Sequence, residues 1–207
     1  MGYDVDAGAD RSPRPAAMDA AATIQEPTTM SWDIDSSHAT LEFSVRHLGL
    51  ASVKGTFHTL RGQVAVDEED LTRSTGSVEI DVASIDTRDE RRDSHLRSAD
   101  FFDVENHPTA TFESREIRRL HDDRFEVTGD LTLHGVTRPV TLQAEVSEFI
   151  TDPWGNRRFA VEVDGEINRT DFGLNWNQVL EAGRLMVGEK VKVHAATEIV
   201  LAQAVAA

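Results

Sequence analysis

Strict alternation of apolar and polar residues is the feature that most constrains the fold of this chain. Leu41, Phe43 and Val45 alternate with polar neighbours, and the same period of two returns along most of the sequence up to Ile199. In a β-strand, successive side chains point to opposite faces of the sheet. Each segment therefore has one apolar and one polar face, which is typical of an antiparallel sheet with a single interior.

Short turns join these strands and predict how the sheet is organised. Turn residues stand at Leu48-Gly49-Leu50, at His134-Gly135 and at Pro153-Trp154-Gly155-Asn156. We count about eight strands, which favours an all-β fold, either a closed antiparallel barrel or a two-sheet sandwich. The length of 207 residues suits one such domain with a sizeable core.

One polar segment interrupts the alternation and predicts a short helix near residues 87-98. Thr87 and Glu90 have the spacing of a capping box, and Asp93 and Arg97, four residues apart, are placed to pair on a helix. Leu96 is the one apolar residue at the centre of this segment. Because a single leucine cannot build a core, the helix is expected to cover a sheet edge or close an opening. A second, helical turn is expected near 177-182, ended by Gly183.

Composition excludes several classes of protein. The formal net charge of −16 argues against nucleic-acid binding, which needs a basic surface. No apolar run approaches the ~20 residues of a membrane-spanning helix. The chain has no cysteine, so disulfides and cysteine metal sites are excluded.

The ends of the chain differ from the centre. Residues 1-30 are rich in Ala, Asp, Pro and Thr, and they lack the basic start and apolar stretch of a secretory signal. We therefore expect a disordered N-terminal extension over 1-30, a folded β domain over 31-202, a C-terminal tail over 203-207, and a cytoplasmic location.

Several spaced segments together resemble the YceI-like family, which is described as polyisoprenoid-binding and lipocalin-like. The resemblance covers about residues 32–200. The segments are Trp32-Asp33-Ile34-Asp35 with Ser37-His38, 43–47 followed by Leu48-Gly49-Leu50, Val53-Lys54-Gly55-Thr56-Phe57, Ala83-Ser84-Ile85-Asp86-Thr87, 92–103, 108–112, 129–140, 169–176 and 187–191.

The resemblance implies an extended eight-stranded antiparallel lipocalin-like barrel around a long apolar tunnel. A long-chain isoprenoid or a fatty-acid-like lipid is the implied ligand, and a homodimer is a further expectation by likeness. Many relatives carry a secretion signal, and this chain departs from them on that point. We expect no cofactor.

A dry, narrow tunnel is built from inward apolar side chains rather than from a catalytic cluster. Our candidates for contact with the lipid are Leu41, Phe43, Val45, Phe57, Phe101, Phe102, Phe112, Leu131, Leu133, Phe172, Leu174 and Trp176. The alternative is that these side chains simply fill a packed barrel, as inward residues do in small barrels.

A polar headgroup needs cations or donors near one end of the tunnel, and arginine suits phosphate oxygens. The candidates are Arg46, His47, Arg92, His95, Arg97, Arg138 and Arg169. Alternatively, they pair with Asp86, Asp93, Asp100, Asp103 and Asp171 and stabilise the helix and turns.

Eight histidines raise the question of a metal site, but no His-x-His or His-Glu-x-x-His spacing is present. We therefore predict no metal site, with a site assembled from distant positions left open.

Three functions follow. The first is a carrier that binds a long lipid without chemistry of its own, so that the chain is not an enzyme. The others are a lipid-modifying enzyme using His47 or His95 as acid or base, and a stress-related barrel with a filled interior.

Overall fold

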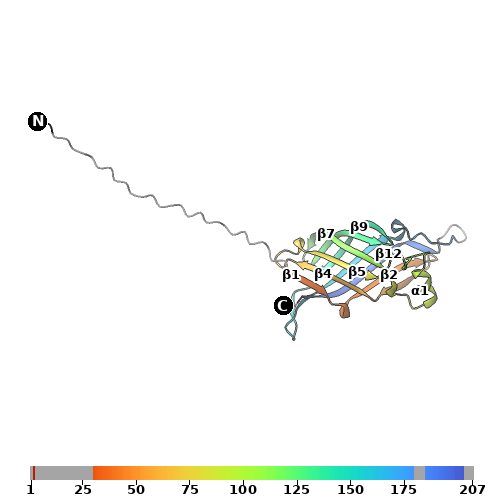
Figure 1. The fold of residues 1–207 in the computed structure, drawn as a ribbon, viewed down its shortest axis with the longest axis horizontal. Coiled ribbons are helices and arrows are strands. Elements are labelled where there is room, and N and C mark those ends of the chain that lie inside the picture. The colour runs from red at the N-terminus through yellow and green to blue at the C-terminus, as the bar shows by residue number, and fades with distance from the viewer. Residues whose placement is uncertain (1, 3–29, 180–184, 203–207) are drawn as a thin grey trace.

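A closed β-barrel with one α-helix forms the body of the protein (Figure 1). The computed structural model describes residue 2, residues 30–179 and residues 185–202. Apart from Gly2 and Met30, the expected extension 1-30 lies outside the described residues, as does the tail 203-207. The strands are β1 (Met30–Ile34), β2 (Thr40–His47), β3 (Ala51–Phe57), β4 (Leu60–Val66), β5 (Thr75–Asp81), β6 (Ile85–Asp86), β7 (Thr109–His121), β8 (Arg124–Leu133), β9 (Val136–Val146), β10 (Ile150–Thr151), β11 (Arg157–Asn168) and β12 (Val187–Leu201).

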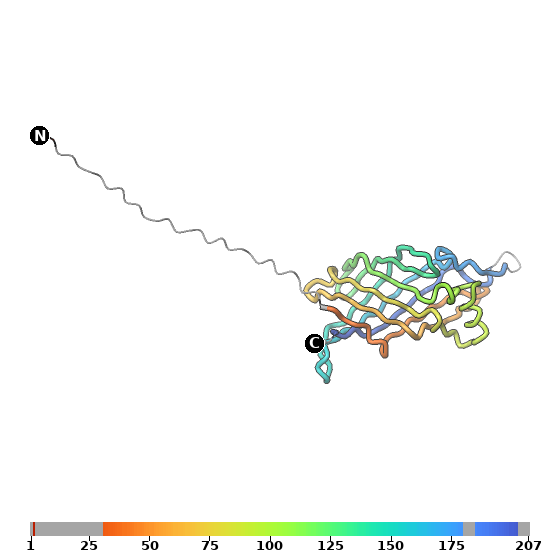
Figure 2. Tube along the Cα trace, in the orientation of Figure 1, coloured from red at the N-terminus to blue at the C-terminus, as the bar shows by residue number. Residues whose placement is uncertain are grey.

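Eight of these strands close the barrel in the order β11-β9-β8-β7-β5-β4-β1-β12. All neighbours are antiparallel, and β11 pairs with β12 from Arg158–Val200 to Asn168–Lys190 to complete the ring. The strands cross the long axis of the barrel obliquely (Figure 2), as closure of a sheet requires. The barrel prediction is therefore confirmed, and the two-sheet sandwich is not formed.

The first hairpin consists of two long, interrupted strands. The first long strand consists of β1 and β2, which both pair with β12 and are separated by the 3-10 helix η1 (Ser36–His38). The second consists of β3, which pairs with β2, and β4, which pairs with β1. The turn between β2 and β3 contains Leu48 and Gly49, both in the left-handed backbone region. Further 3-10 helices are η2 (Leu71–Arg73), η3 (Val82–Ser84) and η4 (Arg169–Phe172).

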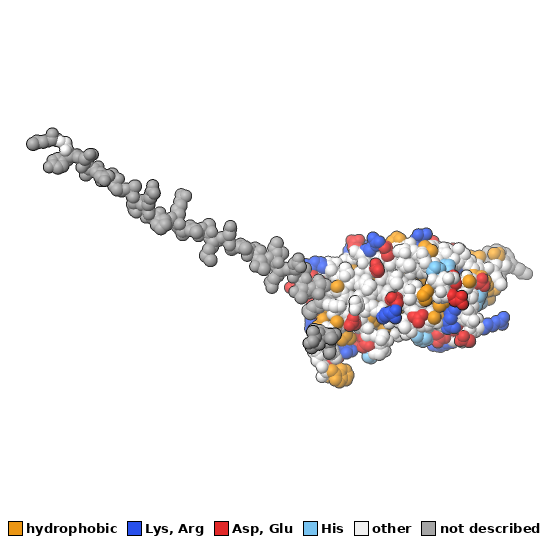
Figure 3. All heavy atoms as spheres, viewed as in Figure 1, with side chains coloured by type: hydrophobic (Ala, Val, Ile, Leu, Met, Phe, Trp, Pro, Cys, Tyr) orange, Lys and Arg blue, Asp and Glu red, His pale blue; other side chains and the backbone are white. Residues whose placement is uncertain are grey.

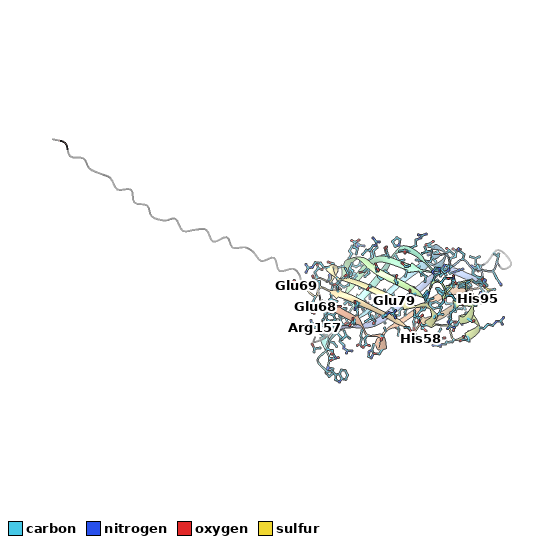
Figure 4. All side chains as sticks on the ribbon, in the orientation of Figure 1. His58, Glu68, Glu69, Glu79, His95 and Arg157 are labelled. Atoms are coloured by element: carbon cyan, nitrogen blue, oxygen red, sulfur yellow. The ribbon has the colours of Figure 1, made fainter. Side chains whose placement is uncertain are left out.

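Helix α1 (Glu90–Arg97) lies at one end of the barrel, together with the loop of residues 98–108 and the β2–β3 and β8–β9 turns (Figure 1). We call this the α1 end. The opposite end, the β1 end, carries the β7–β8 turn and the β10–β11 hairpin. In Figure 4, His95 marks the α1 end, whereas Glu68 and Arg157, an ion pair with 2.5 Å between Oε2 and Nη2, mark the β1 end.

The helix near 87-98 is confirmed, but its start differs from the prediction. Asp89, not Thr87, is the N-cap, and its side chain accepts a hydrogen bond from the Arg92 amide at 3.1 Å. The reason is that Thr87 still belongs to the extended chain after β6, and Arg88 takes a left-handed conformation (φ 63°) before the helix begins.

The expected pair between Asp93 and Arg97 is not formed. Asp93 is buried and accepts hydrogen bonds from the Thr87 amide (3.0 Å) and the Thr87 hydroxyl. Arg97 donates to the carbonyls of Ala83 (3.0 Å) and Ile85 (2.8 Å). Both side chains therefore tie the helix to the segment before it instead of pairing with each other.

Two buried clusters close the interior, one towards each end. The α1-end cluster consists of Val82, Ala110, Leu133, Phe172 and Leu174. The β1-end cluster consists of Trp32, Val66, Phe159 and Ile199. On the face seen in Figure 3, acidic and basic side chains are interspersed over the outside of the wall, as the polar positions of each strand predict.

The expected helical turn near 177-182 falls partly outside the described residues. Its described part, residues 177–179, is not helical, because Val179 forms an antiparallel bridge with Leu185. Among the described helices, none has the length and apolar character needed to cross a membrane.

Candidate functional site

The interior between the two clusters is lined by a row of apolar residues that neighbouring strands supply in register. Val193 of β12 pairs with Phe43 of β2 and with Gly165 of β11. Leu142 of β9, whose side chain reaches Gly165, pairs with Val127 of β8. We call these five residues the middle belt. All five are partly buried, and none belongs to either buried cluster.

Glycines in the wall receive two of the large side chains of this region. A Cβ on Gly165 would lie 2.4 Å from Leu142 Cδ2, and one on Gly55 would lie 2.5 Å from Phe43 Cζ. Such distances are shorter than any real Cβ contact. The side chains of Leu142 and Phe43 therefore lie along the wall over a glycine, rather than extending across the barrel.

Phe112, on the other side of the barrel, is held in the same way. A Cβ on Gly129 would lie 2.5 Å from Phe112 Cζ. The period-two pattern had already placed Gly129 in register with the apolar positions of β8. These glycines leave room for large apolar side chains against the wall.

The structure divides the twelve apolar candidates into three groups. Leu41, Phe43, Val45 and Phe112 are partly buried and lie outside both clusters. Leu133, Phe172 and Leu174 belong to the α1-end cluster, against which Phe57, Phe102 and Leu131 pack. Phe101 and Trp176 pack on each other and on His95. Contact of any of them with a ligand stays a prediction.

His95 belongs to an aromatic group at the α1 end. Its ring meets those of Phe101 and Trp176 edge-on, with centroids 5.2 and 4.8 Å away. Its Nε2 lies 3.2 Å from a carboxylate oxygen of Asp100. Of the two phenylalanines that follow the helix, Phe101 thus packs beside His95, and Phe102 packs against the α1-end cluster.

Arg169 is the one buried residue among the seven headgroup candidates. Its guanidinium donates to the carbonyls of Gly188 (2.9 Å), Val187 (3.3 Å) and Leu174. Burial lowers the pKa of this guanidinium from its ordinary value. Arg169 therefore fastens β12 to the segment after η4, which gives this buried cation a structural role.

The other arginine candidates also bond mainly to backbone and hydroxyl oxygens. Arg92 donates to the hydroxyl and carbonyl oxygens of Thr87, both at 2.7 Å. Arg46 donates to the Leu50 carbonyl at 3.2 Å, and Arg138 donates to that of Thr137 at the same distance. His47 is partly buried.

The predicted pairing of these cations with nearby aspartates occurs only at His95 and Asp100. Asp86 lies 3.2 Å from His58, Asp93 bonds to Thr87, and Asp103 accepts from Asn106 at 2.8 Å. Asp171 is exposed. The arginines are instead satisfied by carbonyls, because the turns at the α1 end present many backbone oxygens that no ladder uses.

The outer wall carries polar grooves that differ from the interior. One has a volume of about 640 Å³ and is bordered by charged side chains of both signs, among them Lys54, Asp164 and Lys192. Another, of about 550 Å³, runs beside Arg61 and Glu79. Their charged borders do not suit a hydrocarbon chain.

Sequence reasoning missed two clusters of possible ligand atoms, one of which lies at the α1 end. Asp103, His107 and His134 each bring one such atom within 4.8 Å of the others. The spacing of Asp103 and His107, four residues apart, was the available signal. His134 could not be linked to these two residues from the sequence, because it lies far along the chain in the β8–β9 turn. Only the pairing of β7 with β8 brings it close to them.

Comparison with known proteins identifies the family. Residues 32–199 match the YceI-like domain. Protein YceI of Escherichia coli is 41% identical over 142 residues, which are 69% of this chain and 74% of the relative. A UPF0312 protein of Serratia proteamaculans is 42% identical over 142 residues, which are 69% of this chain and 73% of the relative.

Solved structures share the fold at lower identity. BcnA of Burkholderia cenocepacia superposes with a TM-score of 0.70 at 22% identity, covering 80% of this chain and 98% of BcnA. A polyisoprenoid binding domain from Saccharophagus degradans superposes with a TM-score of 0.65 at 19% identity, covering 84% of this chain and 99% of that domain's chain. The sequence matches and the closed barrel agree with the resemblance stated above: this chain belongs to the YceI-like family.

Proposed function

We propose that this protein binds one long hydrocarbon chain, such as an isoprenoid, inside the barrel and carries it without chemical change. The observation that carries the proposal is the middle belt. Its apolar residues face the interior, lie between two buried clusters, and remain only partly buried. In a barrel filled by its own side chains, these positions would be as fully buried as those of the clusters.

The exposure of the middle belt is not explained by the outer grooves alone. Phe43, Gly165 and Val193 also border the larger outer groove. Leu142 and Val127 border neither outer groove and are partly buried as well. Their accessible surface is therefore assigned to the interior, where a hydrocarbon chain would cover it.

The α1 end carries exposed apolar side chains suited to the entry of a lipid. Leu50 is 74% exposed and Val179 is 72% exposed. The segments that carry Leu50 and Val179 are joined through Met186. The Leu48 amide donates to the Met186 carbonyl at 2.7 Å, and the Met186 amide donates to the Gln178 carbonyl at 2.9 Å. An apolar rim beside the α1-end cluster favours this end as the entrance.

The energetics favour a hydrocarbon chain without choosing among chains. Burying a long prenyl tail removes on the order of 600 Å² of apolar surface, or roughly 15 kcal/mol before costs at ~25 cal/mol per Å². Loss of ligand freedom offsets much of this. An acyl chain of similar length would gain about as much, so selectivity must arise from length and from the polar end.

The name of one solved relative, a polyisoprenoid binding domain, supports an isoprenoid as the first ligand to test. For the polar end, we propose Arg46, His47 and Arg138, because the guanidinium of Arg169 is bonded to three carbonyls. A carrier is preferred to an enzyme because the residues of the middle belt carry no acid, base or nucleophile.

Two substitutions on adjacent residues test the proposal. Ala195 pairs with Leu41 and Val163 on the inward face of β12, whereas Ala196 pairs with Thr40 and Glu162 on the outward face. Purified wild-type protein is expected to release a bound lipid in native mass spectrometry, or to bind a fluorescent polyene fatty acid after delipidation. Ala195→Phe should abolish binding, and Ala196→Phe should not.

The same pair distinguishes a hollow barrel from a filled one. In a hollow barrel, Ala195→Phe occupies free space and leaves the free energy of unfolding nearly unchanged. In a filled barrel it overpacks the core and costs about 1–3 kcal/mol. Wild-type protein that binds neither prenyl nor acyl chains would refute the carrier function.

A further inference from the structure

A cluster of two imidazoles and one carboxylate lies at the α1 end, outside the middle belt. One ligand atom from each of Asp103, His107 and His134 lies within 4.8 Å of the other two, and all three residues are partly buried. Asp103 and His107 belong to the loop after α1, and His134 belongs to the β8–β9 turn. The cluster therefore joins two segments that are distant in sequence.

The backbone brings these side chains together. The His107 amide donates to the Asp103 carbonyl at 2.8 Å, which closes one turn and places both side chains on the same side of the loop. His134 and Gly135 form a tight turn with φ values of 52° and 72°. A Cβ on Gly135 would lie 2.7 Å from Cε1 of His107, so this glycine makes room for the imidazole.

The hydrogen bond of His134 leaves a suitable nitrogen free. Its Nδ1 lies 3.3 Å from the Phe172 carbonyl, and because a carbonyl only accepts, Nδ1 carries the proton. Nε2 then carries the lone pair. A metal-binding histidine commonly donates its other N–H to a backbone carbonyl in this way. The rings of His107 and His134 meet edge-on with centroids 4.8 Å apart.

We propose that Asp103, His107 and His134 bind a divalent transition metal ion such as Zn²⁺. Two imidazoles and a carboxylate suit such an ion, whereas Ca²⁺ and Mg²⁺ prefer oxygen ligands alone. Bonds of ~2.0–2.2 Å require ligand atoms to lie roughly 3.3 Å apart, and these atoms lie within 4.8 Å of one another, so the loop and the turn need to approach by no more than about 1.5 Å. Water would complete the coordination.

The ion would fasten the loop after α1 to the β8–β9 turn. This loop carries Phe102, which packs against the α1-end cluster, and the Phe172 carbonyl that holds His134 belongs to the same cluster's backbone. Metal binding is thus expected to stabilise the α1 end of the barrel. This inference concerns the metal site alone and holds whatever the interior binds.

A second group of possible ligands serves as an internal control. Asp35, His38 and Glu198 also lie within 4.8 Å of one another. However, Asp35 already accepts from the amide (3.0 Å) and the hydroxyl (2.5 Å) of Ser37 and bonds to His38, and Glu198 is paired with Arg158 at 2.5 Å. Both carboxylates are therefore occupied, so this cluster is not expected to bind the ion.

The test uses the full-length protein, freed of metal with a chelator, and ZnCl₂ as the probe in isothermal titration calorimetry and thermal unfolding. We expect one Zn²⁺ per chain and a higher Tm. The variants are Asp103→Asn and His134→Asn, because asparagine tolerates the left-handed backbone of these two positions, and His107→Gln. Each should weaken binding by about tenfold or more, and the control His38→Gln should not.

A measurement on wild-type protein covers the case of a variant that fails to fold. In ¹⁵N-labelled protein, Zn²⁺ should shift the ring nitrogen resonances of His107 and His134 and leave those of His38 and His194 in place. Zn²⁺ binding that is equal in wild type and His107→Gln, or resonance shifts confined to other histidines, would overturn the proposal.

Discussion

The ring of Phe43 lies over Gly55, its direct partner across the β2–β3 ladder. A Cβ built on Gly55 would lie 2.5 Å from Phe43 Cζ and 2.8 Å from Thr87 Cγ2. The glycine thus provides the space in which the ring lies along the wall. The width of the interior at this level depends on a residue that contributes no side chain.

We predict that Gly55→Ala displaces the Phe43 ring into the interior. The neighbours are side-chain atoms, so the barrel can still close, at a cost of about 1–3 kcal/mol in the free energy of unfolding. Lipid binding should weaken at the same time, because the displaced ring occupies the proposed lumen. Urea unfolding and titration with a fluorescent fatty acid measure the two effects.

Gly76→Ala is the matched control for this substitution. A Cβ there would meet its nearest neighbour, Val64 Cγ2, at 3.7 Å, an ordinary contact. Stability and binding are expected to stay close to wild type. Equal effects of the two substitutions would show that loss of glycine itself, rather than the position of Phe43, is responsible.

Asp93 is predicted to be the main anchor of α1. It is 3% exposed and accepts from both the amide and the hydroxyl of Thr87. Asp93→Ala leaves these donors without their acceptor inside the protein, which should cost about 1–3 kcal/mol. Hydrogen exchange of the Thr87 amide should accelerate as well.

Glu90→Ala provides the comparison within the same helix. Glu90 is 87% exposed at its side chain and pairs with Arg97 at 3.4 Å, so its loss should change stability by less than about 1 kcal/mol. If Glu90→Ala were the more damaging substitution, the anchor would have been assigned to the wrong residue.

Asp35 and His38 should make the free energy of unfolding depend on pH in two ranges, one acidic and one above pH 6.5. Hydrogen bonds from Ser37 and His38 lower the pKa of Asp35 from 3.8 to about 2. The bond to Asp35 raises the pKa of His38 above 6.5. The contribution of Asp35 is therefore complete above pH 3.8 and is lost as the pH falls towards 2. That of His38 is complete below pH 6.5 and is lost as the pH rises through its raised pKa.

Asp35→Asn tests this coupling. In an NMR titration, the pKa of His38 should fall towards the ordinary value of about 6.5. The loss of stability from mildly acidic to mildly alkaline pH should also be smaller than in wild type. An unchanged His38 pKa would mean that the pair does not form in solution.

The strands and the closure of the barrel could be predicted because one apolar face per strand permits few arrangements. Alternation placed Phe43 and Leu131 on the inward face without any knowledge of their neighbours. It could not say which inward residues end in a buried cluster, as Leu133 does, and which stay partly buried, as Phe43 does. That distinction depends on the glycines across the ladder, and therefore on register.

The polar groups were harder to predict for the same reason. Spacing within the helix suggested a pair between Asp93 and Arg97, but Thr87, η3 and β6 offered both residues hydrogen-bond partners outside the helix. Likewise, the approach of His134 to His107 results from the antiparallel pairing of β7 with β8, in which Thr111 faces Thr132. Local patterns therefore described the wall well, and tertiary contacts decided the ends of the barrel.

The last prediction separates structure from ligand binding at Arg169. Each nitrogen of its guanidinium donates to a carbonyl, of Gly188, Leu174 or Val187. Lysine has a single ammonium group and cannot reproduce this fork. Arg169→Lys should therefore lower the free energy of unfolding by about 1–3 kcal/mol, because carbonyls inside the protein lose their donor.

Lipid binding by the folded fraction of Arg169→Lys should remain as in wild type, because the side chain is occupied by backbone carbonyls and not by a headgroup. Arg91→Lys is the control for a loss of arginine at an exposed position, with stability expected to stay within about 0.5 kcal/mol of wild type. The readouts are urea unfolding and fluorescent fatty-acid titration at equal folded concentration. Weak binding with unaltered stability in Arg169→Lys would reverse the assignment, since it would place the headgroup beside this buried cation.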